Sequence, residues 1–142
     1  MSISLTQEQI NKIRLEVKNK VLNAEKISTK DSELIECFKS KFTICEVAYK
    51  IMEQRIKKLK DRKNIKLNLI NIKPNIKKLK YKINENLLEK LFGSKDIRGS
   101  KSIKKLRDAL THDSKLNDIE ELKKRQTEIF NTMNTFLTEL KK

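Results

Sequence analysis

One long apolar run restricts the fold of this chain more than any other feature. Seven residues recur at alternating spacings of four and three, the pattern of a helix with one buried stripe. They are Phe38, Phe42, Cys45, Tyr49, Met52, Ile56 and Leu59. A helix over residues 32–60 would be about 43 Å long. We expect it to form the spine of a bundle by packing within the chain. The alternative is a seam shared with a second subunit.

Shorter periodic stretches and capping residues predict further helices around this spine. The predicted helices run from Thr6 to Lys26, from Pro74 to Phe92, from Ser100 to His112, and from Asp118, as N-cap, to the end of the chain. The structural face of the first helix is marked by Ile10, Ile13, Val17, Val21 and Ala24. Gly93 is expected to end the second of these in a left-handed conformation. The pattern from Lys66 to Ile72 is ambiguous between a loop, an extended edge and a helix, and we interpret it as a loop.

Length and composition favour one helical domain. The chain has 142 residues but only two Gly and one Pro, which is few turn residues for a sandwich or a barrel. We therefore predict a single all-α domain over residues 1–142. Its expected architecture is an up-and-down bundle of four long helices plus one short helix.

The charge of the chain predicts an anionic partner. Lys and Arg number 34 against 19 Asp and Glu, so the net charge is +15. Between Arg55 and Lys82 twelve cations stand against Asp61 alone, a local charge of +11. Such a field attracts nucleic acid first and an anionic membrane surface second. The alternative is that the charge only keeps the protein soluble.

The remaining composition predicts a cytoplasmic protein without a cofactor. Cys37 and Cys45 lie eight positions apart on one predicted helix, too far to pair with each other, and are expected to be buried free thiols. No cluster of Cys and His has the spacing of a zinc site, so no bound metal is expected. Residues 1–20 contain no signal-peptide core, and no apolar run is long enough to span a bilayer.

The predicted short helix contains the only histidine of the chain, His112. Asp108 lies one turn before it, from where a carboxylate can reach the imidazole. Arg107 is five positions before His112 and therefore about 140° away around a regular helix. The two side chains share a cleft only if the helix loosens near Thr111, and the residues that follow, Asp113 and Ser114, favour such loosening.

This segment resembles the signature of HEPN domains, which are small helical bundles. In that family an Arg, usually followed by a polar residue, precedes a His by four to six intervening positions. Here the match comprises Arg107, Asp108 and His112, together with the lead-in over residues 101–106 and the preceding helix end over residues 91–93. The resemblance implies a metal-independent endoribonuclease of toxin or antiviral-defence type, with its active site shared by two copies. By position, Arg107 would bind phosphate, His112 would transfer protons and Asp108 would orient the imidazole.

The chemistry of RNA cleavage agrees with a shared site. The reaction needs a base for the 2′-hydroxyl and an acid for the leaving 5′-oxygen, whereas one chain supplies one imidazole. A two-fold dimer would supply two. The partners expected are therefore RNA, a second copy of the chain, and possible regulators such as an antitoxin. The cations expected to bind RNA are Lys77, Lys78, Lys80, Lys95, Arg98, Lys104 and Lys105.

Two other functions remain open at this point. The chain could bind nucleic acid through its basic stretch without cutting it, or it could be a helical adaptor that uses the apolar seam. The motif residues also have a purely structural interpretation: Asp108 could pair with Lys104, Arg107 could be a solvated surface residue, and His112 could be favoured by the dipole at a helix C-terminus.

Overall fold

The computed structural model describes residues 4–26, 29–59, 68–96, 99–113 and 116–142. Over these residues the prediction of an all-helical fold is confirmed, because the regular structure consists of six helices and includes no strand. They are α1 (Gln7–Lys26), α2 (Thr29–Leu59), α3 (Leu69–Lys78), α4 (Glu85–Phe92), α5 (Ile103–Asp113) and α6 (Leu116–Leu140). None of the helices, within the described ranges, has the length and apolar character needed to cross a membrane.

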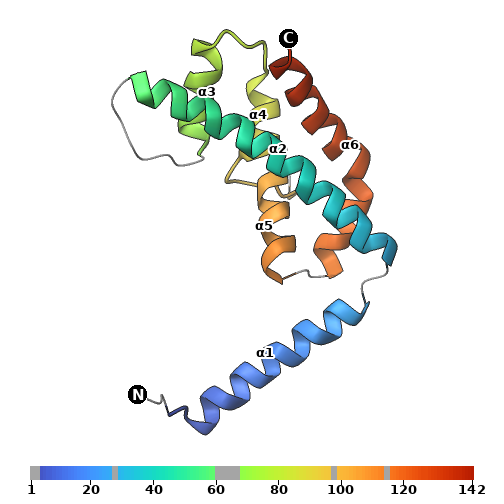
Figure 1. Ribbon diagram of the computed structural model, residues 1–142. Helices are drawn as coiled ribbons and strands as arrows, with labels where there is room; N and C mark the ends of the chain where they lie inside the picture. The colour runs from blue at the N-terminus through green and yellow to red at the C-terminus, as the bar shows by residue number, and fades with distance from the viewer. Residues whose placement is uncertain (1–3, 27–28, 60–67, 97–98, 114–115) are drawn as a thin grey trace.

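Helix α2 is the spine of the fold, as predicted. It lies across α4, α5 and α6 (Figure 1) and contacts α3, α5 and α6. Its apolar stripe from Phe38 to Met52 is buried within the chain, so these residues form no seam with a second subunit. Phe92 at the end of α4 lies at the centre of the core. Its ring centroid is 5.8 Å from that of Phe42 and 5.6 Å from that of Phe136.

Helix α1 lies outside this core. A capping box formed by Thr6 and Gln9 begins it: the Gln9 amide donates to Thr6 Oγ1 at 3.1 Å and the Thr6 amide donates to Gln9 Oε1 at 3.0 Å. However, α1 extends away from the other helices (Figure 1), and Ile13, Val17 and Val21 are exposed. Its apolar stripe therefore does not belong to the core of one chain.

The predicted helix from Pro74 to Phe92 is instead two helices. Asn68 caps α3 by accepting a hydrogen bond from the Asn71 amide, so Pro74 lies well inside the helix and not in its first turn. Residues 69–72, interpreted as part of a loop, are helical; residues 66–67 lie outside the described part. A Schellman motif ends α3, because the Tyr81 amide bonds to Ile76 O and the Lys80 amide to Lys77 O. Lys80 takes the left-handed position at φ 62°, where Gly is usual.

Gly93 follows α4 as predicted, but for a different physical reason. Its φ is −61°, so it is not left-handed. Its amide donates to Glu89 O at 2.9 Å, and a Cβ at this position would collide with that same oxygen. The position needs Gly because of the close backbone approach.

The last two helices begin at different kinds of residue. Ser102 caps α5, because its Oγ accepts from the Lys105 amide at 3.2 Å, and it also donates to Gly93 O at 2.6 Å. Helix α6 begins at Leu116, so Asp118 lies in its first turn and is not the N-cap.

The predicted arrangement of four long helices plus one short one is not confirmed. Helices α1, α2 and α6 have 20, 31 and 25 residues, and the other three have 8 to 11.

The two thiols differ in their surroundings. Both are free, but Cys37 is exposed, which corrects the prediction that both are buried. Burial raises the pKa of the Cys45 thiol to about 12, so it stays protonated at neutral pH.

We expect a thiol reagent at pH 8 to modify one cysteine per folded chain within minutes, and Cys37→Ser to remove that reaction. Mass spectrometry of the labelled protein measures it; rapid labelling of Cys45 in the native protein would contradict the burial.

Candidate functional site

Helix α5 holds the motif in a fixed position between α2 and α6. Ile103, Leu106 and Leu110 follow the helical period and are buried in the core. The helix contacts α2, α4 and α6. The motif side chains therefore start from a rigid backbone, and their directions follow from helix geometry.

Arg107 is held against α2 by charge and by an aromatic ring. Its Nη2 is 2.9 Å from Glu46 Oε2 and its Nη1 is 3.4 Å from Oε1, a bidentate pair. The guanidinium carbon lies 4.7 Å from the centroid of the Phe42 ring. Only 19 % of the Arg107 side chain is exposed, so the alternative that Arg107 is a solvated surface residue is wrong. Burial lowers its pKa, but the hydrogen bonds and charge of Glu46 and the charge of Asp108 raise it above the ordinary value.

Asp108 contacts cations and not the imidazole. Its Oδ1 accepts from Arg107 Nε at 2.9 Å and its Oδ2 lies 3.4 Å from Lys104 Nζ. The pairing with Lys104 is therefore confirmed. Within the described residues no hydrogen bond joins Asp108 to His112. The predicted orienting role thus has no contact to carry it in a single chain.

His112 lies on a different side of α5 from Arg107. The helix continues to Asp113, and Thr111 Oγ1 donates to Arg107 O at 2.8 Å, as expected inside a regular helix. The predicted loosening near Thr111 is therefore wrong, and the two motif side chains diverge by about 140°. His112 is exposed on the last turn of α5. One chain brings Arg107 and Asp108 together, whereas no hydrogen bond among the described residues joins His112 to either.

The cations predicted to bind RNA fall into two groups. Lys104 and Lys105 are on α5, where Lys105 Nζ is 2.6 Å from Asp96 Oδ1. Lys77, Lys78 and Lys80 are exposed together around the end of α3, and Lys77 is 3.5 Å from Glu85. Lys95 is exposed in the loop after α4. Arg98 and residues 60–67 lie outside the described part of the chain.

Glu46 is the site residue that the sequence did not reveal. It is 61 positions before Arg107 in the chain and has no motif of its own. Its place next to the α2 stripe residues Phe42 and Cys45 was the available signal, since a carboxylate at the border of a buried stripe needs a cation. Phe42 was predicted only as a core residue, although its ring also faces the guanidinium.

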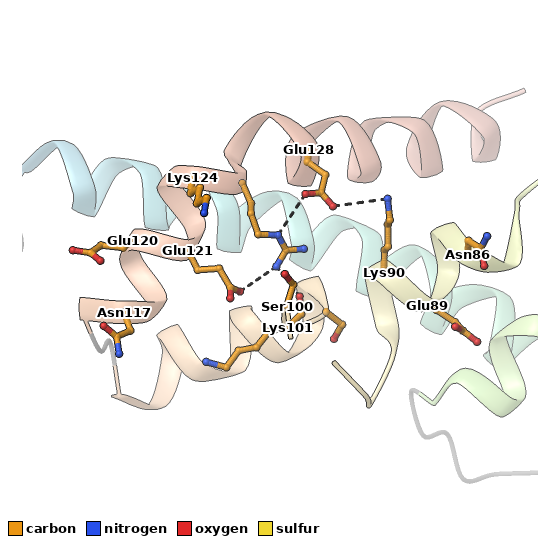
Figure 2. Close-up of a pocket in the computed structure, with 12 residues that line it drawn as sticks. Asn86, Glu89, Lys90, Ser100, Lys101, Asn117, Glu120, Glu121, Lys124 and Glu128 are labelled. Carbon is orange, nitrogen blue, oxygen red and sulfur yellow. Dashed lines mark hydrogen bonds and ion pairs between the residues drawn. The ribbon is translucent and has the colours of Figure 1, made fainter. Parts of the chain in front are cut away.

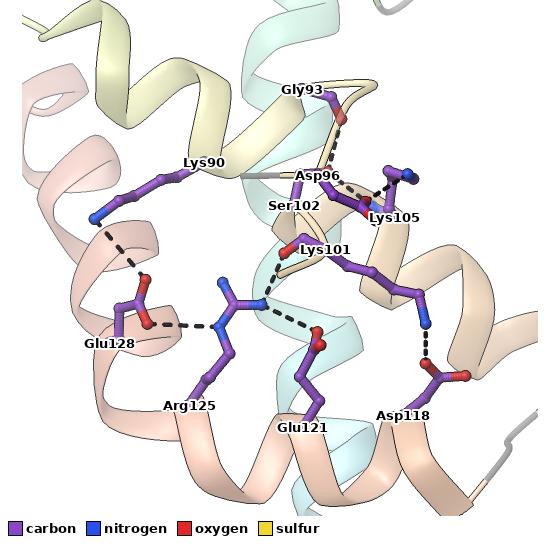
Figure 3. A network of polar contacts seen from close by, with 10 residues as sticks. All are labelled: Lys90, Gly93, Asp96, Lys101, Ser102, Lys105, Asp118, Glu121, Arg125 and Glu128. Carbon is purple, nitrogen blue, oxygen red and sulfur yellow. Dashed lines mark hydrogen bonds and ion pairs between the residues drawn. The ribbon is translucent and has the colours of Figure 1, made fainter. Parts of the chain in front are cut away.

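A polar groove lies between α4, residues 100–102 before α5, and α6 (Figure 2). Its volume is about 970 Å³. Arg125 of α6 crosses it and donates to Lys101 O at 2.7 Å and to Glu121 at 3.0 Å (Figure 3). Lys101 in turn pairs with Asp118. Because Lys90, Lys101 and Arg125 are already paired with carboxylates, we assign this groove to fastening the loop before α5 onto α6.

No protein-family model, no curated protein and no solved structure matches this chain. Nor do three or more Cys, His, Asp or Glu side chains in the described part of the chain converge as ligands for a metal ion. The residues of this chain that bear on its function are therefore chiefly Arg107, His112 and the exposed lysines.

Proposed function

We propose that the protein is a HEPN-like, metal-independent endoribonuclease of toxin or antiviral-defence type whose active site is shared by two copies. The observation that carries this proposal is the arrangement of α5. It presents the single imidazole of the chain on its exposed last turn, while the buried face of the same helix is fixed in the core. A rigid and exposed imidazole is suited to meet a second one across a two-fold axis.

The separation of Arg107 from His112 makes the second copy necessary. In one chain the two side chains diverge, so one phosphodiester cannot contact both. Two facing α5 helices would place one His112 as base for the 2′-hydroxyl and the other as acid for the 5′-oxygen. Glu46 fixes the Arg107 guanidinium, and each of its terminal nitrogens has a second N–H that can donate to a phosphate oxygen.

The test is incubation of the purified protein with RNA in EDTA, beside a His112→Ala preparation that controls for co-purifying nucleases. We expect fragments that end in 2′,3′-cyclic phosphate from the unchanged protein only. Equal cleavage by both preparations would assign the activity to a contaminant. Binding without cleavage would exclude the nuclease.

Exposed lysines around the end of α3 are proposed to hold the RNA backbone. We expect Lys77→Glu/Lys78→Glu/Lys80→Glu to weaken RNA binding by at least about tenfold and to lower the salt slope by about 2, at about 0.7 per phosphate contact. Titrations at several salt concentrations measure both. The matched control reverses three exposed lysines elsewhere, Lys30, Lys124 and Lys141. If both triple variants lose the same affinity, net charge and not this surface binds the RNA.

A second function, RNA binding without cleavage, is favoured by one specific observation. Glu46 and Asp108 already neutralise Arg107, which weakens its attraction for a phosphate. Under this alternative Arg107 is a core ion pair and the lysines alone contact the backbone. The EDTA experiment separates the two, because only the nuclease yields cyclic-phosphate ends.

A further inference from the structure

Two apolar stripes of this chain face solvent. On α1, Ile13, Val17 and Val21 are 48 %, 55 % and 50 % exposed. A separate helix of this length is marginal in water unless its apolar face is covered. These three residues of α1 recur every four positions, so they form one continuous face and not scattered positions.

The second stripe lies on α2, opposite the side that faces the core. Ile44, Val47 and Ile51 are 56 %, 49 % and 51 % exposed and recur every three or four residues. In Figure 1 no described helix lies in front of α2. Helix α2 is therefore apolar on two sides: one contributes to the core, and the other has no cover within the described part of the chain.

The chain connection prevents α1 from covering this second stripe in its own molecule. Only residues 27–28 separate α1 from α2, so a helical hairpin would place residues 17 and 38 opposite each other, and 10 and 45. Val17, the centre of the α1 stripe, would then face Phe38, nine residues short of Val47. Glu8 and Ser4 would lie opposite Val47 and Ile51 instead. The two stripes do not match in register within one chain.

A second copy has no such restriction. We propose that α1 of each copy packs on the outer stripe of α2 of the other copy, with Val17 near Val47. The exchange buries both stripes in both chains, which is two helix–helix contacts per dimer. A single α2 to α2 contact would bury only the α2 stripe and leave α1 exposed. The surface area that it buries would be near the low end of the range for stable interfaces. This pairing does not depend on the proposed nuclease activity.

Substitutions on opposite faces of α1 test the proposal in the full-length protein. We expect the unchanged protein to be a dimer at micromolar concentration in analytical ultracentrifugation. Ile13→Glu/Val17→Glu should raise the dissociation constant at least about 100-fold. The matched control, Leu15→Glu/Leu22→Glu, introduces the same charges on exposed residues of the opposite face and should leave the dimer intact. A monomer at all concentrations, or a dimer that resists the first pair, would overturn the proposal.

Mixing two single variants shows whether the contact joins different chains. Val17→Glu and Val47→Lys should each be monomeric alone, because each places a charge against an apolar stripe. Mixed, they should form a dimer in which one α1 to α2 contact pairs Glu with Lys and the other is unchanged. If α1 folded back on its own α2, mixing would restore nothing, and the exchange would be excluded.

Discussion

Replacing His112 with Ala is expected to remove RNA cleavage while RNA binding keeps its affinity and salt dependence. Each proton transfer contributes about 10²–10⁴-fold, so the loss of both imidazoles in a dimer should lower the rate at least about 1,000-fold. Binding should persist because His112 is one exposed side chain of a chain with charge +15. Single-turnover cleavage and filter binding of the same RNA measure the two effects.

Mixed dimers provide the control for this prediction. With a ninefold excess of the Ala variant, only about a tenth of the unchanged chains have an unchanged partner, if partners exchange at random. The cleavage rate per unchanged chain should then fall about tenfold. A rate that stays constant per unchanged chain would contradict the shared site, even if His112→Ala alone is inactive.

Replacing Arg107 with Met is expected to lower the free energy of unfolding by about 3–5 kcal/mol, because it leaves the Glu46 carboxylate half-buried without its cation. The whole stability of a domain is about 5–15 kcal/mol, so this variant should be close to unfolding at 37 °C. The side chains of Arg107 and Glu46 are only 19 % and 15 % exposed, which keeps water from replacing the lost partner. Urea denaturation followed by circular dichroism measures the change.

The double variant Arg107→Met/Glu46→Gln is the control for the ion pair. Removal of the stranded charge should recover at least about half of the lost stability, as buried pairs commonly do. If Arg107→Met lowers the free energy of unfolding by less than about 1 kcal/mol, the pair contributes no more to stability than an exposed salt bridge does. Arg107 would then be free to bind phosphate at little cost to the fold.

The features of the fold that could be predicted from the sequence are those set by the apolar period and by local capping residues. The stripe from Phe38 to Met52, the capping box at Thr6 and the cap at Ser102 follow local rules, and the structure contains all three. The break after α3 was missed because Lys80, and not Gly, takes the left-handed position. No local residue pattern distinguishes a Lys that ends a helix from one that continues it.

The candidate site could likewise be predicted only where local structure determines it. The direction of His112 follows from its place on α5, but the partner of Arg107 comes from α2 and requires the tertiary fold. The position of α1 could not be predicted from the sequence either, because a helix that packs on its own core and one that packs elsewhere have the same periodic sequence. The covered side of a helix is a property of the whole assembly.

The hydroxyl of Ser102 limits how this chain can vary among descendants. N-cap positions usually accept Asp, Asn, Ser or Thr, because any of them can accept the amide hydrogen. Here the same oxygen must also donate to Gly93 O. An ionised Asp accepts but cannot donate, Asn donates only from its nitrogen and not from the accepting oxygen, and Ala can do neither. Natural selection should therefore confine this position to hydroxyl side chains, which is a narrower choice than capping alone would allow.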